Sequence, residues 1–198
     1  VTKSTPMGSI DHPFNPAALA MGADASFVAR SMDRDPKHLQ AILTRAEKHK
    51  GTSFVEIYQN CNIFNDGAFE IFTEKSTKPL HALFVEQGKP LTFGANNEMG
   101  IRFDGLRPEV VTLGDKYSAD DLWIHDEKDF YKAQVLVRLF DNPSEVAAYF
   151  PRPFGVFYTA DRPCYEDMMA LQVEEAMTSK GMGDLDKLIR GKETWEIL

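Results

Sequence analysis

The chain has 198 residues, enough for one ordinary domain or two small ones with a buried core. Apolar residues make up 43% and charged residues 26%, values that exclude disordered and collagen-like classes. The 22 basic and 30 acidic residues give a net charge of -8, which argues against a broad surface for nucleic acid.

Targeting and membrane segments are not evident in the sequence. No apolar run reaches the roughly 18 residues that a spanning helix needs, and the opening VTKSTPMGSIDHPF lacks the apolar core of a secretion signal. Cys61 and Cys164 are too few and too far apart for a disulfide framework, so reduced thiols are expected. We therefore expect a cytoplasmic protein without membrane contact.

The first third of the chain predicts alternating helices and strands. A capping residue followed by proline at Asn15-Pro16 and again at Asp35-Pro36 marks two helix starts. Apolar runs rich in strand formers lie between and after these helices. The predicted elements are a helix over 16–22, a strand over 26–30, a helix from 36 to its stop at Gly51, and a strand over 52–58.

A strand, a helix and a strand in about 33 residues form a βαβ unit, which implies parallel strands joined by a right-handed crossover. Residues 15–60 are therefore interpreted as the last part of a doubly wound α/β sheet. Such sheets place their chemistry beyond the carboxyl ends of their strands, and the loop 59–67 lies there. Cys61 follows the strand by three residues.

The pattern changes after Gly67. Short apolar stretches broken by glycine and proline predict strands in hairpins within 80–115. Further along, the pattern predicts a helix over 129–140, a buried strand over 154–158, and helices over 166–178 and 184–190.

Cys61 is the main candidate for chemistry, because a thiol in a polar loop at this edge is accessible to a metal or a substrate. A small buried hydrophobe is the ordinary alternative for a lone cysteine. A nucleophilic role needs a histidine base, and the five histidines show no spacing that selects one. A soft metal site needs more thiolates than this chain holds, so any cluster must take ligands from elsewhere.

Two other residues, Cys164 and Glu56, have side chains suited to chemistry. Cys164 follows Arg162-Pro163 at a strand-to-helix junction, where a structural role is expected. Glu56 lies in an otherwise apolar strand, so its carboxylate needs either a salt-bridge partner or a functional role. Glycine-rich phosphate loops are absent from the sequence.

Three segments resemble a known family. FNPAALAMGADASFVARSMDRDPKHLQAILTRAEKHKGTSFVEIYQNCNIFNDGAF, which begins at Phe14, resembles the β subunit of 2-oxoacid:ferredoxin oxidoreductases, particularly the 2-oxoglutarate type. FGVFYTADRPCYEDMMA, from Phe154, and the final GKETWEIL are similar to later parts of that subunit. The resemblance implies the C-terminal part of a doubly wound, parallel-sheet thiamine-diphosphate-binding α/β domain over 1–67, followed by an α+β extension over 68–198.

The family's β subunit binds thiamine diphosphate, magnesium and one 4Fe-4S cluster held by four cysteines. The segment around Cys61 matches the last of these, so the resemblance implies that Cys61 is a cluster ligand. The other three cysteines and the thiamine diphosphate motif are expected upstream of Val1, so the catalytic and cofactor-binding residues remain unassigned and this piece alone is expected to be inactive.

The implied reaction is coenzyme A-dependent oxidative decarboxylation of a 2-oxoacid, with electrons passed through the iron-sulfur cluster to ferredoxin. An α subunit, ferredoxin, coenzyme A and a 2-oxoacid such as 2-oxoglutarate are the implied partners. Two alternatives stay open. The piece acts chiefly as a subunit-interaction module, or Cys61 serves a thiol-dependent hydrolase.

Overall fold

A computed structural model describes residues 5–8, 10, 13–140, 150–193 and 195 of the chain. Its contacts divide the chain into two compact units, Val1–Asp161 and Arg162–Leu198. Among the described residues, no helix combines the length and the apolar character needed to cross a bilayer.

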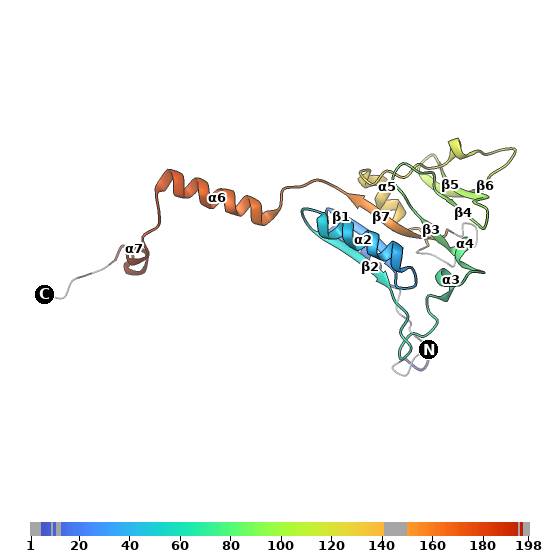
Figure 1. Cartoon of the computed structure of the whole chain (residues 1–198), viewed down its shortest axis with the longest axis horizontal. Coiled ribbons are helices and arrows are strands. Elements are labelled where there is room, and N and C mark those ends of the chain that lie inside the picture. The colour runs from blue at the N-terminus through green and yellow to red at the C-terminus, as the bar shows by residue number, and fades with distance from the viewer. Residues whose placement is uncertain (1–4, 9, 11–12, 141–149, 194, 196–198) are drawn as a thin grey trace. The chain divides into compact units, whose positions relative to one another are not determined.

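The predicted βαβ unit is confirmed (Figure 1). The side chains of Asn15 and Asp35 accept hydrogen bonds from the backbone N–H groups of Ala18 and His38, and so cap the helices that follow them. β1 and β2 run parallel in continuous register. The elements are α1 (Pro16–Gly22), β1 (Phe27–Met32), α2 (Pro36–Lys48) and β2 (Ser53–Tyr58).

The main sheet has the strand order β2-β1-β7-β3, with β3 at Ala82–Phe84 and β7 at Arg152–Thr159. β7 is antiparallel to β1 and parallel to β3, so the sheet is mixed. This arrangement confirms the predicted α/β class. β7 comes from the predicted extension and pairs with β1 of the predicted first domain, so the sheet continues across the boundary proposed after Gly67.

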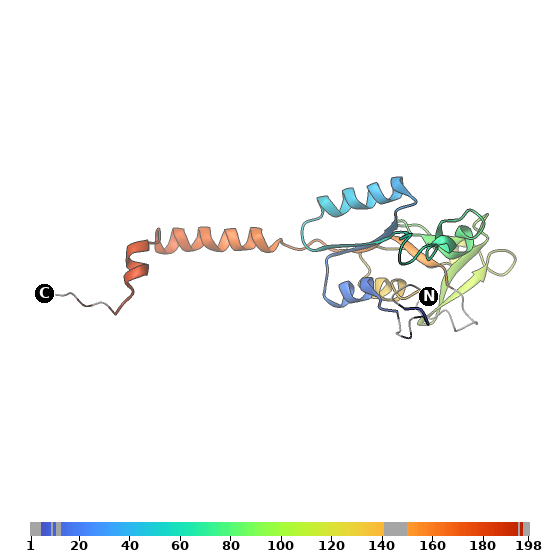
Figure 2. The same cartoon turned by 90° about the horizontal axis from the view of Figure 1, so that it is seen from below.

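Helices cover both faces of the main sheet (Figure 2). Ile42 of α2 packs with Phe27, Ala29 and Val156 on one face. On the other face, α1 and α5 (Phe130–Leu136) pack against Val28 in the largest core cluster. Every residue of β1 is buried as a result, as its apolar run predicts for a central strand.

The predicted hairpins form a second, antiparallel sheet of three strands in the order β4-β5-β6. The predicted helix over 129–140 begins after the capping Asp129 but ends at Leu136, and Phe140 has a positive φ of 77°. The bounds are β4 at Thr92–Phe93, β5 at Met99–Asp104, β6 at Arg107–Thr112, α3 at Glu70–Thr73, α4 at Lys78–His81 and η1 at Ala119–Asp121.

The second unit contains α6 (Tyr165–Lys180) and α7 (Leu185–Arg190). Both were predicted from the sequence. The side chain of Asp184 caps α7 by accepting a hydrogen bond from the Lys187 backbone N–H.

A buried ion pair joins the two parallel strands. Arg30 on β1 is 1% exposed, and its Nε donates to the Glu56 Oε2 on β2 at 2.7 Å. The Arg30 Nη1 also donates to the Pro153 carbonyl on β7 at 3.1 Å, so one guanidinium links three strands. The central carbon of the guanidinium, Cζ, lies 5.5 Å from the centre of the Tyr58 ring and 5.1 Å from the centre of the Phe157 ring. Of the two roles predicted for Glu56, a salt bridge or a functional role, the salt bridge is the one that the structure shows.

Replacing Glu56 by leucine should destabilise the chain by about 3 kcal/mol, because the buried guanidinium of Arg30 loses its carboxylate. The double variant Arg30→Met with Glu56→Leu should lose less than the single variant, since no unpaired charge remains buried. Urea unfolding of both variants and the parent measures the difference. A double variant less stable than Glu56→Leu would contradict this account of the pair.

Candidate functional site

The carboxyl ends of β1 and β2 lie together, as the βαβ unit predicts. The Asp33 backbone N–H donates to the Tyr58 carbonyl at 3.0 Å, and the Asp33 side chain accepts from the Asn60 N–H at 3.4 Å. The loop that carries Cys61 therefore starts at the functional edge of the sheet.

The side chain of Asn60 holds this loop closed. Its Nδ2 donates to the Asp66 carboxylate at 2.9 Å, and its Oδ1 accepts from the Gly67 N–H at 2.9 Å. Within the loop, the Asn65 N–H donates to the Cys61 carbonyl at 2.9 Å. Asn60 is a positioning residue that was not predicted, although the turn-forming residues at both ends of the loop are a sequence signal for it.

The Cys61 side chain is half-buried near backbone N–H groups of its own loop. The N–H groups of Phe64, Ile63 and Asn65 lower the pKa of its thiol below the ordinary value, against smaller opposing effects of desolvation and Asp66. Hydrogen bonds to the charged form favour the thiolate, which is the form that ligates metals and attacks electrophiles. This local environment suits a soft metal ligand.

Aromatic side chains support the loop from the end of β2. Tyr58 stacks on Phe69 with ring centres 4.4 Å apart, and it also contacts Phe72 and Phe154. The loop itself exposes Ile63 and Phe64, which are 70% and 58% exposed. The loop thus begins and ends at a stacked aromatic pair and exposes apolar side chains between them.

The other candidate residues do not join Cys61. Within the described part of the chain, no group of three or more His, Cys, Asp or Glu side chains is arranged to hold a metal, and no histidine contacts the Cys61 sulfur. Cys164 lies in the second unit, where its thiol donates to the Glu166 carboxylate at 3.0 Å and this bond raises its pKa. The two cysteines therefore have opposite electrostatic environments.

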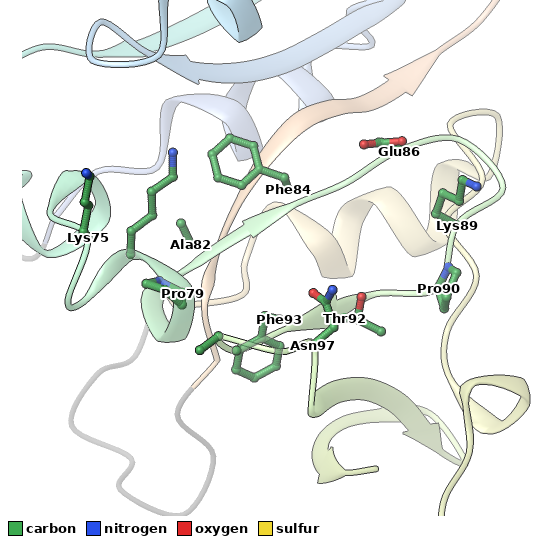
Figure 3. A pocket seen from close by; sticks show the side chains of 13 residues that line it. Lys75, Pro79, Ala82, Phe84, Glu86, Lys89, Pro90, Thr92, Phe93 and Asn97 are labelled. Atoms are coloured by element: carbon green, nitrogen blue, oxygen red, sulfur yellow. The ribbon is translucent and has the colours of Figure 1, made fainter.

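A separate groove of about 750 Å³ lies between the α3–α4 turn and strands β3 and β4 (Figure 3). Lys75 and Lys89 lie at its opposite ends, and Phe84 and Phe93 line it. The ammonium of Lys78 lies 4.7 Å from the centre of the Phe84 ring and 3.4 Å from the Asp35 carboxylate. Cys61 does not line this groove.

Comparison with known proteins gives a consistent set of relatives. The chain is 38% identical over its whole length to 2-oxoglutarate oxidoreductase subunit KorB of Mycobacterium tuberculosis, and it spans 52% of that protein. The 2-oxoacid:ferredoxin oxidoreductase subunit β of Saccharolobus solfataricus is 43% identical over a shorter segment. That segment makes up 33% of this chain and 21% of the relative. No family model matches the chain.

The predicted family resemblance is confirmed. The chain is similar to the β subunits of 2-oxoacid:ferredoxin oxidoreductases, and it spans about half the length of the Mycobacterium tuberculosis protein that it matches. It also shares its fold with a 2-oxoglutarate:ferredoxin oxidoreductase from Magnetococcus marinus that was solved with 2-oxoglutarate, coenzyme A and succinyl-CoA bound. That likeness has a TM-score of 0.60 at 19% identity and covers 98% of this chain and 50% of the other.

Alkylation by iodoacetamide at neutral pH should be faster at Cys61 than at Cys164, because a lowered pKa leaves more thiolate and a raised pKa leaves less. Mass spectrometry of the two peptides over a pH series measures both rates. The difference between the two alkylation rates should become smaller as the pH rises, because both thiols are then ionised. Equal rates at pH 7 would contradict the proposed role of the backbone donors.

Proposed function

We propose that this chain supplies one thiolate ligand, Cys61, to the 4Fe-4S cluster of a 2-oxoglutarate:ferredoxin oxidoreductase β subunit. The carrying observation is the position of Cys61 at the start of the loop after β2, at the carboxyl edge of the parallel pair, where the N–H groups of Phe64, Ile63 and Asn65 lower the pKa of its thiol. Backbone donors of this kind stabilise a ligating sulfur and tune a cluster's potential. The remaining ligands come from outside this chain, whose sequence has only one other cysteine.

The reaction we assign to the assembled enzyme converts a 2-oxoacid and coenzyme A to an acyl-CoA and carbon dioxide. Two electrons and one proton are released, and two ferredoxins each take one electron. The bound thiamine diphosphate and cluster supply the electron-sink and electron-transfer chemistry. The same proposal includes three further points. The remaining ligands of the thiamine diphosphate and the cluster lie outside this chain, an α subunit is its partner, and the enzyme is cytoplasmic.

The residues of this chain contribute positioning rather than bond making. Asn60 closes the loop on Asp66 and Gly67, which fixes the direction of the Cys61 side chain. Tyr58 and Phe69 support the loop from below with a stacked pair. A loop held in this way would present the Cys61 sulfur to a cluster iron in a fixed direction. The thiol-hydrolase hypothesis is less well supported, because no histidine contacts Cys61 among the described residues.

Substitution of Cys61 by alanine should remove most of the cluster iron and the 2-oxoglutarate-dependent, coenzyme A-dependent reduction of a viologen dye. The test uses the chain assembled anaerobically with the α subunit and the segment that carries the other cysteines. Cys164→Ala is the matched control and should keep both iron and activity, because Cys164 lies in the other unit.

The chain without the α subunit and without the segment that carries the other cysteines should hold no cluster and show no turnover. Full iron content and full activity in Cys61→Ala would contradict the ligand assignment. Equal losses in the Cys164→Ala control would mean that the cysteine changes act through folding.

A further inference from the structure

The groove beside strands β3 and β4 is separate from the Cys61 loop and has the dimensions of a ligand site. Its volume of about 750 Å³ falls within the roughly 300–1,000 Å³ of small-molecule pockets. All of its lining residues belong to the first unit, Val1–Asp161. They come from the α3–α4 turn, from α4, from β3 and β4, and from the turns that follow these two strands. We call it the β3–β4 groove.

Backbone hydrogen bonds hold the walls of the β3–β4 groove in place. The Gly94 N–H donates to the Pro79 carbonyl at 2.7 Å, which ties the end of β4 to α4. On the other side, the His125 N–H donates to the Lys89 carbonyl at 2.9 Å. Because both walls are bonded to neighbouring segments, the groove is preformed and a ligand has little structure to order when it binds.

Apolar side chains form the floor of the groove. Phe93 is 4% exposed and belongs to the largest core cluster. Ala82 is buried in a second cluster with Phe154, and the Phe84 ring stacks on Phe154 with ring centres 5.6 Å apart. The floor is therefore anchored in the core, and it offers apolar surface to the body of a ligand.

Lysine side chains dominate the charge of the groove. Lys75, Lys78 and Lys89 line it against a single carboxylate, that of Glu86, although the chain as a whole has a net charge of -8. Among the described residues, neither Lys75 nor Lys89 has an ion-pair partner. Lys78 is held by the Asp35 carboxylate at 3.4 Å. A hollow with excess positive charge above an apolar floor favours anions.

The two ends of the groove differ in charge. Lys75 lies at one end (Figure 3), and Lys78 follows in the same helical turn, whose Lys78 N–H donates to the Glu74 carbonyl at 2.8 Å. Lys89 lies at the other end, which it shares with Glu86 (Figure 3). Since a carboxylate offsets part of the charge of Lys89, the end with Lys75 and Lys78 is the stronger site for an anionic group.

We propose that the β3–β4 groove binds an organic anion. Its phosphate or carboxylate group lies between Lys75 and Lys78, and its apolar body lies along Phe84 and Phe93. Charge-assisted hydrogen bonds and apolar burial both contribute, so neither an inorganic anion nor a neutral apolar molecule uses the whole groove. The inference uses neither Cys61 nor the reaction, so it stands apart from the proposed function.

Titration of the full 198-residue chain with 1-naphthyl phosphate tests the proposal, because this probe joins an anionic group to an apolar body. NMR of the ¹⁵N-labelled chain should show amide shift changes concentrated at Lys75, Thr92 and Gly94. Each half of the probe, 1-naphthol or inorganic phosphate, should bind at least about tenfold more weakly than the whole. Replacing the phosphate by a carboxylate, in 1-naphthoate, should keep binding, and the tighter of the two anions identifies the preferred group.

Charge reversal locates the anionic group. Lys75→Glu should weaken 1-naphthyl phosphate about tenfold and leave 1-naphthol unchanged, because only the charged half meets this residue. Lys48→Glu makes the same charge change on α2, outside the groove, and is the matched control, with less than about a twofold effect. Lys89→Glu should weaken binding less than Lys75→Glu. Circular dichroism checks that each variant keeps the fold.

Three results would overturn the proposal. The first is a set of shift changes that lies outside the groove. The second is a naphthyl phosphate that binds no better than one of its halves. The third is an equal effect of Lys75→Glu and Lys48→Glu, which would mean that the overall charge of the chain, and not the groove, governs binding.

Discussion

The parallel pairing of β1 and β2 is the constraint on which the candidate site depends. α2 crosses one face of the sheet, so both strands must end at the same edge. Arg30 and Glu56 hold the pair together from inside, and the guanidinium reaches on to β7 through the Pro153 carbonyl. Because the guanidinium of Arg30 is buried and bonded to both neighbouring strands, it fixes the strand ends and the start of the loop that follows β2.

The chemistry of Cys61 follows from that position and from the loop's backbone. The loop is short and closed by Asn60, and backbone N–H groups of the residues that follow Cys61 lie close enough to the sulfur to lower the pKa of the thiol. These donors act as fixed partial positive charges, and they favour the thiolate without a nearby lysine or arginine. One cysteine in this environment suits a cluster shared with ligands beyond the chain.

The local signals in the sequence were sufficient for most of the secondary structure. Asn15 and Asp35 before prolines marked the helix starts, and the apolar runs identified β1 and β2. The position of Cys61 after β2 could be predicted for the same reason. Pairings between distant segments were not predictable in this way.

Three features depended on such distant contacts. The insertion of β7 beside β1, the choice of Arg30 as the partner of Glu56, and the donors around the Cys61 sulfur appear only once the chain is folded. No periodicity in a single sequence encodes which strand neighbours which.

In the proposed enzyme the Cys61 sulfur is bonded to iron. The most direct test is the low-temperature EPR spectrum of the reduced, assembled enzyme carrying Cys61→Ser, compared with the parent. An oxygen ligand in place of sulfur changes the electronic structure of a cluster, so the account predicts altered g-values or loss of the signal. A spectrum identical to the parent in shape and intensity would contradict it, and would mean that Cys61 only packs in its loop.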